Sequence, residues 1–268
     1  MPAIRFSRAA ANPHRSVPPG AGRWPVAALL LASLMLAPVC GCTPRGNDLN
    51  DGKTFANPDN AQLAGAVRDG NDALARELVA AGANPNAVDD RGVPLLQWAM
   101  LGQDRGAYRL LLDLKADPAR GNADGQTALH VAAMGKDAFW LDDLLERGMS
   151  PDTPNTVTGA PPLFDALRAR LPDNVERLLK AGARLDTRDR SGTTPLHQAA
   201  LVNDPASVLA FLEAGADPRA TDRTGATFQD YMYDGDPALL NGPTRRSIEA
   251  IDAWLRAHGV PVRGDSSR

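Results

Sequence analysis

The sequence predicts an all-α solenoid of about six helix-turn-helix units with β-hairpin-like fingers between them. Three markers recur in step, 33 or 34 residues apart. They are a turn glycine (Gly92, Gly125, Gly159, Gly192, Gly225), an apolar anchor (Leu63, Leu96, Leu129, Leu163, Leu196) and a helix-ending position (Gly82, Lys115, Gly148, Gly182, Gly215). Each short helix pair buries only part of its surface, so the units need neighbours of the same kind to close a core.

The stretch 189–217 shows the unit most clearly. It contains a turn at Asp189–Gly192, a first helix that begins at Thr194–His197, a second helix at Pro205–Glu213 and a stop at Gly215. Threonine caps a helix with its side chain, and proline fits the first helical position, where no N–H is needed. Glycine at a helix end favours the left-handed backbone that terminates the helix.

The segments GQTALHVAA (Gly125–Ala133) and GTTPLHQAA (Gly192–Ala200) resemble the signature of the ankyrin repeat. The resemblance covers about residues 57–261 and implies an ankyrin-repeat solenoid. It also implies that the faces of the first helices and the fingers form a concave protein-binding surface. Some copies depart from the signature: Gln97 and Phe164 occupy the histidine position, Pro94 replaces threonine, and Lys115 replaces glycine.

The N-terminal residues 1–41 predict a lipoprotein signal peptide. A basic start precedes the apolar run Val26–Val39, which is too short to span a bilayer comfortably but suits a signal peptide. The run ends in Val39-Cys40-Gly41-Cys42, which resembles a bacterial lipobox. This resemblance implies cleavage before Cys42, lipidation of Cys42, and a periplasmic, lipid-anchored protein of the outer membrane. An uncleaved anchor or a buried cysteine pair is the alternative.

The remaining chain divides by the repeat markers. Residues 42–56 are polar and predict a flexible tether. The predicted repeat domain, 57–261, has units at 57–86, 87–118, 119–151, 152–183, 184–218 and 219–261. The last unit is a C-terminal cap with an insertion at 234–244, which either covers the end of the stack with Leu239 and Leu240 or serves as a binding loop. Residues 262–268 predict a frayed tail.

No catalytic or metal-binding motif is present in the sequence. The net charge of −3 and the absence of basic runs do not favour nucleic acid as a partner. His130 and His197 belong to the repeat signature, and their imidazoles are expected to bond turn backbone. Adjacent carboxylates such as Asp142 and Asp143 are typical of a solvated helix face. We therefore expect no catalytic residues, no metal and no cofactor, and a chain that is a monomer when unbound.

Surface positions are the remaining candidates for function. The fingertips are expected at 89–91, 122–124, 156–158, 189–191 and 222–224, and two further rows lie one and four positions after the histidine site. Aromatic residues, methionine and arginine are typical of protein interfaces. For Trp98 and Val131, packing between adjacent first helices is an equal alternative. The candidate protein-binding residues are Arg91, Trp98, Leu101, Val131, Met134, Arg168, Arg190, Gln198, Leu201, Arg223 and Tyr231.

These features predict a non-catalytic, lipid-anchored protein that holds another protein. Bacterial lipoproteins with ankyrin-like repeats resemble immunity proteins that neutralise phospholipase toxins delivered to the periplasm. The resemblance implies inhibition by occlusion, with a toxin or effector as the partner. The alternative is a structural scaffold, or a protective partner, of an envelope protein complex.

Overall fold

The protein is described by a computed structural model over residues 55–232 and 242–263. These residues form twelve helices in six consecutive pairs. The first helices of the pairs are α1 (Pro58–Arg68), α3 (Leu95–Leu101), α5 (Ala128–Met134), α7 (Pro162–Arg168), α9 (Pro195–Leu201) and α11 (Phe228–Met232). The second helices are α2 (Asp72–Ala80), α4 (Arg105–Asp113), α6 (Ala138–Glu146), α8 (Pro172–Lys180), α10 (Pro205–Glu213) and α12 (Gly242–Ala257).

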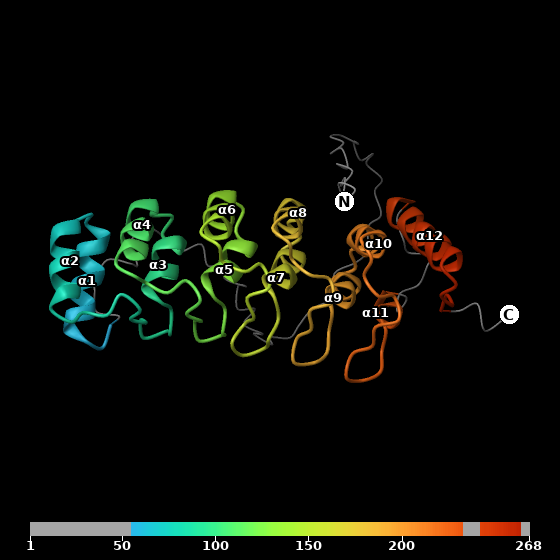
Figure 1. Cartoon of the computed structure of the whole chain (residues 1–268), viewed down its shortest axis with the longest axis horizontal. Coiled ribbons are helices and arrows are strands. Elements are labelled where there is room, and N and C mark those ends of the chain that lie inside the picture. Colours follow the sequence, from blue (N-terminus) through green and yellow to red (C-terminus); the bar gives the residue numbers. More distant parts are fainter. Residues whose placement is uncertain (1–54, 233–241, 264–268) are drawn as a thin grey trace, which may run out of the picture.

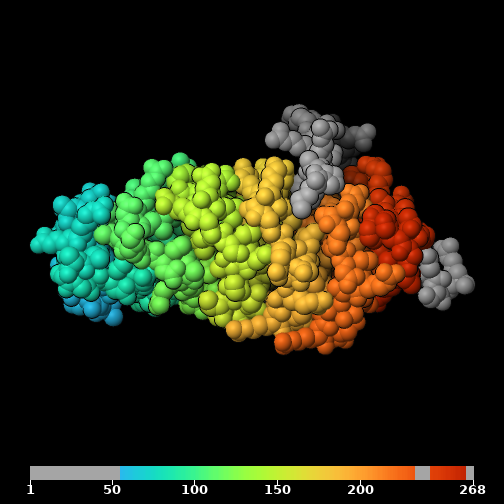
Figure 2. Space-filling view, viewed as in Figure 1, coloured from blue at the N-terminus to red at the C-terminus, as the bar shows by residue number. Residues whose placement is uncertain are grey.

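The helix pairs stack in chain order into an elongated body (Figures 1 and 2). In Figure 1 the second helices form the upper layer, the first helices lie below them, and the connecting fingers hang from the lower edge. First helices pack on first helices along the stack, as α5, α7 and α9 show, and α12 packs on α10 at the C-terminal end. The predicted all-α solenoid of helix pairs is confirmed.

The repeated leucines form the centre of this stack. All five predicted anchors are almost completely buried (Leu63, Leu96, Leu129, Leu163, Leu196). They belong to one continuous hydrophobic core in the described residues, together with Leu111, Leu144, Leu178 and Leu212 from the second helices. Ala132 and Ala199 of the first helices are buried in the same core. The core therefore runs through all the units.

The fingers are hairpin-like turns with paired backbone, as predicted. Each closes with a bond between residues that flank its tip; for example, the amide of Asp189 donates to the carbonyl of Thr193 over 3.1 Å. Neighbouring fingers are also linked by backbone bonds: Thr156 N–H to Gly125 O at 2.9 Å, Arg190 N–H to Thr158 O at 2.8 Å, and Arg223 N–H to Ser191 O at 2.9 Å. The described fingers of units three to six thus form a ladder across the stack.

Some predicted element boundaries differ from the structure. The side chain of Phe55 is buried in the core, so the folded part begins inside the predicted tether. Val262 is buried, and Arg263 donates its backbone amide to Gln229 Oε1 at 2.9 Å, so the chain remains packed beyond residue 261. Gly242 to Thr244 were predicted as part of a loop, but they form the first turn of α12.

Other predictions fall outside the described residues. These are the signal peptide, Cys42, the tether up to residue 54, residues 234–241 of the insertion with Leu239 and Leu240, and the tail from residue 264. Within the described residues, no helix is both long and apolar enough to cross a membrane.

Candidate protein-binding face

Four first helices end on a side chain that faces solvent. We call Leu101, Met134, Arg168 and Leu201 the helix-end row, because they are the last residues of α3, α5, α7 and α9. Leu101 and Leu201 are each 50% exposed and Met134 is 38% exposed, which is unusual for large apolar side chains in this structure. The equivalent residue of α1 is Arg68, which pairs with Asp69 at 2.9 Å.

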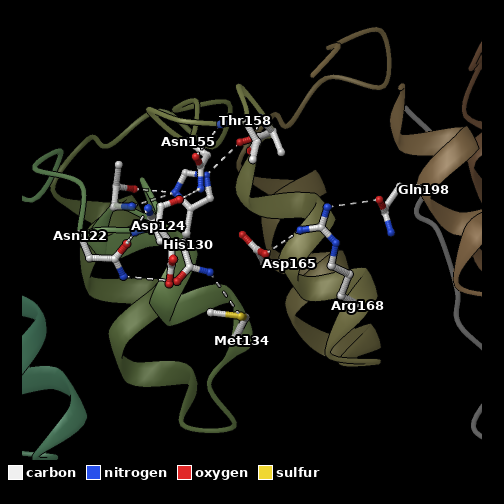
Figure 3. Close-up of polar contacts among 12 residues, drawn as sticks. Asn122, Asp124, His130, Met134, Asn155, Thr158, Asp165, Arg168 and Gln198 are labelled. Carbon is white, nitrogen blue, oxygen red and sulfur yellow. Dashed lines mark hydrogen bonds and ion pairs between the residues drawn. The ribbon is translucent and has the colours of Figure 1, made fainter. Parts of the chain in front are cut away.

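Arg168 is the charged member of this row, and polar contacts hold it on two sides. Its Nη1 lies 3.2 Å from Oδ1 of Asp165, one turn earlier on α7. Its Nη2 donates to Oε1 of Gln198 on α9 at 3.5 Å. Figure 3 shows Arg168 reaching from Asp165 across to Gln198, on the side of the first helices where Met134 also lies. Half of the Arg168 side chain remains exposed.

The carboxylate under Arg168 is in an unfavourable environment. Only 6% of the Asp165 side chain is exposed. Burial raises the pKa of Asp165, and the positive charge of Arg168 opposes this only in part. The neighbouring His130 has a pKa below its usual value, because desolvation disfavours its charged form. Asp165 therefore has Arg168 as its ion-pair partner among the described residues.

The row one helical turn earlier consists of Trp98, Val131, Asp165, Gln198 and Tyr231, and most of its side chains are inaccessible to a partner. Trp98 is 7% exposed and Gln198 is 6% exposed, so both are mainly packing residues in this structure. Little of either side chain is therefore accessible to a partner, which for Trp98 favours the alternative of a packing residue. Val131 is partly buried and packs against the core. Tyr231 is also partly buried, and its hydroxyl donates to Asp222 Oδ2 in the last finger.

The predicted finger arginines are exposed, and they differ in their contacts. Arg91 pairs with Asp89 of its own finger at 2.8 Å. Arg190 donates from Nη2 to the carbonyl of Thr156 in the preceding finger at 3.0 Å. Arg223 is exposed at the tip of the last finger. Arginines on the fingers of units two, five and six are therefore accessible.

The two motif histidines have structural roles. Nδ1 of His130 lies 2.7 Å from Thr127 Oγ1, and Nε2 lies 2.9 Å from the carbonyl oxygen of Ala160 in the next unit. His197 repeats this arrangement with Thr194 and with Ala226 O at 3.1 Å. The expected bonds from imidazole to turn backbone are confirmed. Gln97 makes the equivalent bond, since its Nε2 donates to Gln126 O at 2.7 Å.

Two further large apolar side chains are exposed in the described residues. Val157 is 51% exposed at the tip of the finger of unit four, at a predicted fingertip position. Leu74 is 40% exposed on α2, one of the second helices, away from the fingers (Figure 1). A count of apolar residues at fingertip positions would have found Val157. Leu74 gives no such signal, because it lies on a second helix and outside the repeated surface positions.

The described part of the chain shows no grouping of three His, Cys, Asp or Glu side chains that could hold a metal ion. Its buried histidines are engaged on both ring nitrogens, as described above. The face thus combines a row of exposed apolar side chains, which includes the ion-paired guanidinium of Arg168, with a ladder of fingers that carry exposed arginines.

Comparisons with known proteins agree with this geometry. The family model "Ankyrin repeats (3 copies)" matches residues 63–155, and "Ankyrin repeats (many copies)" matches residues 162–231. Protein PhlB of Serratia liquefaciens is 39% identical over 173 residues, which cover 62% of this chain and 74% of that protein. Cyclin-dependent kinase inhibitor 2A of Monodelphis domestica is 39% identical over 82 residues, which cover 31% and 47% respectively.

A solved structure shows the same architecture. The crystal structure of the ankyrin repeat domain of Bcl-3 aligns with a TM-score of 0.58 and 29% sequence identity. The alignment covers 71% of this chain and 81% of the Bcl-3 chain. The match thus extends over most of the stacked helix pairs.

Proposed function

The chain belongs to the ankyrin-repeat family, and we propose that it is a non-catalytic, lipid-anchored protein that binds another protein through the helix-end row and the fingertips. The main support is the helix-end row itself. Leu101, Met134 and Leu201 expose large apolar side chains at equivalent positions of three first helices, on a body whose other leucines are mostly buried. Exposed apolar side chains gathered on one face are typical of interaction sites.

The proposed anchor is Cys42, which lies in the lipobox-like sequence Val39-Cys40-Gly41-Cys42. Acyl chains on one cysteine hold a protein at a membrane with about 0.8 kcal/mol for each buried CH₂ group. The stack would then face the periplasm from the outer membrane. Growth with a labelled fatty acid tests this: the wild-type chain is expected to take up label and sediment with membranes, and Cys42→Ala is expected to do neither. Label that persists in Cys42→Ala would refute the anchor.

We further propose that the partner is an effector that acts in the periplasm, and that the protein is an immunity protein. Binding would occlude the effector's active site, and the anchor would keep the inhibitor at the membrane under attack. This proposal rests on the ankyrin-repeat fold and the lipobox-like N-terminus together. Deletion of the gene separates it from a scaffold: viability lost only beside effector-producing siblings supports immunity, whereas a defect in pure culture supports an envelope scaffold.

The binding face can be tested with matched variants. We expect Leu101→Ser combined with Leu201→Ser to weaken partner binding by about tenfold or more, since two apolar contacts of about 1 kcal/mol each are lost. Leu74→Ser is the control, because Leu74 is similarly exposed but lies on a second helix. Binding is measured by surface plasmon resonance with the captured partner. Equal losses in the row variant and the control would contradict the assignment of the face.

A further inference from the structure

Arg168 differs from the other members of the helix-end row in charge and in how it is held. It ends α7, between the helices that carry Met134 and Leu201. A guanidinium has five N–H donors. Two of its nitrogens contact Asp165 Oδ1 and Gln198 Oε1, at 3.2 Å and 3.5 Å. Half of the side chain still faces solvent, so donors remain for a further acceptor.

Stability alone does not account for this arrangement. An ion pair with a half-exposed arginine contributes little to folding. At the position of Asp165, the other units carry Trp98, Val131, Gln198 and Tyr231, none of which is charged at neutral pH. Placing a carboxylate there opposes folding, because a buried charge loses its hydration. What the carboxylate does achieve is to fix the orientation of the Arg168 guanidinium.

The fingers, which lead into the other ends of the first helices, carry further arginines. Arg190 and Arg223 are exposed on the fingers of units five and six. The acidic residues of the same fingers are partly buried and bonded to backbone amides: Asp189 accepts from Ser191 and Thr193, and Asp222 accepts from Thr224 and Ala226. The arginines are therefore the more exposed charges of these two fingertips, which favours an acidic partner.

We infer that Arg168 is the anchor of the binding face and receives a carboxylate from the partner protein. The partner's docking segment carries an Asp or Glu side chain between apolar side chains, which contact Met134 and Leu201. Arginine binds carboxylates with two parallel hydrogen bonds, and a guanidinium that is already oriented loses less entropy on binding. Asp165 and Gln198 are positioning residues for Arg168. This inference rests on the proposed function, because it names the chemistry of the partner at the same face.

A random dodecapeptide library displayed on phage tests the inference without knowledge of the natural partner. The library is panned on the purified full-length chain, on Arg168→Gln, and on the Leu101→Ser, Leu201→Ser double variant. We expect wild-type protein to enrich peptides that carry Asp or Glu beside Leu, Ile, Phe or Met. Arg168→Gln is expected to lose the acidic preference and keep the apolar one, and the double variant is expected to lose both kinds of peptide.

A double-mutant cycle then measures the contact directly. One enriched peptide and its Glu→Gln form are titrated calorimetrically into the wild-type chain and into Arg168→Gln. Loss of a charged hydrogen bond is expected to weaken wild-type binding by about tenfold to a hundredfold, and the same peptide change is expected to have little effect on Arg168→Gln. Arg76→Gln, at a half-exposed arginine of the second helix α2, is the control and is expected to bind both peptides like wild type.

The outcomes separate the inference from the proposed function. Enriched peptides that need Leu101 and Leu201 but show no acidic preference would overturn the role of Arg168 and leave the binding face intact. Peptides that bind the double variant as well as wild type, or no enriched peptide at all, would overturn the binding face and the inference with it. If the chain binds anionic phosphatidylglycerol vesicles in an Arg168-dependent way and enriches no acidic peptides, the partner of Arg168 is a lipid surface. That result would also overturn the inference.

Discussion

The histidines of the repeat show how one side chain joins two units. In His130, Nδ1 accepts from the backbone N–H of Thr127 at 3.2 Å, so Nε2 carries the proton that is donated to Ala160 O. The ring is therefore neutral, and burial lowers its pKa. Gln97 achieves the same inter-unit bond with an amide, which explains why the second unit tolerates the loss of histidine.

We expect His130→Ala to lower the free energy of unfolding by about 1–3 kcal/mol, because it leaves the buried backbone N–H of Thr127 without a partner and removes the bond from the ring to Ala160 O. His130→Gln is expected to lower the free energy of unfolding by a clearly smaller amount, since Gln97 shows that an amide reaches the equivalent carbonyl. Urea unfolding followed by circular dichroism measures both. Equal losses in the two variants would show that the bond to the next unit contributes nothing.

The same rings predict how stability depends on pH. Burial lowers the pKa of both His130 and His197, so the unfolded chain binds protons more readily than the folded chain. Their contribution is complete above the unfolded pKa of about 6.5 and is lost progressively as the pH falls below that value and through the lower folded pKa. Asp165 has the opposite effect on stability. Burial raises its pKa, so acidification protonates it more readily in the folded chain and removes a buried charge.

We therefore expect the urea midpoint to fall between about pH 7.5 and about pH 5.5, and to fall less in the His130→Gln, His197→Gln double variant. The comparison uses urea titrations of both chains at each pH. His258→Gln, at an exposed histidine that directly follows α12, provides the control variant. An unchanged slope in the double variant would contradict the assignment.

At the scale of the element, the finger is the part that depends most on its neighbours. Gly125 has a φ of 78°, and an added Cβ would lie 2.5 Å from both Val157 N and Asn155 Oδ1 of the next finger. Only glycine allows the backbone bond from Thr156 N–H to Gly125 O at 2.9 Å. The ladder of fingers is thus built on close backbone approach.

Gly125→Ala is expected to destabilise the protein by about 1–2 kcal/mol for the left-handed backbone, and by about 1–3 kcal/mol more for the clash with the next finger. Gly148→Ala is the matched control: its φ is 87°, but nothing lies within 4 Å of an added Cβ. Gly148→Ala should therefore lose only the stability that the left-handed backbone costs. Thermal unfolding of the two variants compares them, and equal shifts would mean that the finger contact is unimportant.

At the scale of the whole molecule, stability is distributed along the stack. Each unit contacts only its neighbours, so the free energy of folding is close to a sum of units and interfaces. The C-terminal end is closed by α12, whose Ile251 and Leu255 are fully buried, and by the segment that carries Val262. Gln229 Nε2 holds this segment through the carbonyl of Pro261 at 3.1 Å.

Ile251→Ala is expected to cost about 2–5 kcal/mol through the cavity it leaves. Amide hydrogen exchange should accelerate in α10 and α12, while α4 and α6 keep their wild-type protection. Glu249→Ala, at an exposed position of the same helix, is the control. Uniform acceleration across all helices would show that the stack unfolds as a single cooperative unit.

Much of the fold could be predicted because it depends on residue types that recur with a fixed period and act locally. The leucine anchors, the Thr194 cap and the helix-ending glycines recur with one period, and each acts within its own unit. The predicted boundaries of the repeat domain were less accurate. Phe55 and Val262 carry no repeat signal and are buried only because the end units leave apolar surface to cover. The signal peptide and the anchor at Cys42 remain predictions.

The sequence by itself determined the period, the helix pairs and the capping residues, because each depends on neighbours a few positions away along the chain. The tertiary structure alone decided which repeated positions are accessible. Trp98 and Leu101 were both candidate binding residues, with packing as an equal alternative for Trp98, and the structure buries the former and exposes the latter. The contact of Arg168 with Gln198 arose in the same way, since it joins two units whose relative rotation no single repeat specifies.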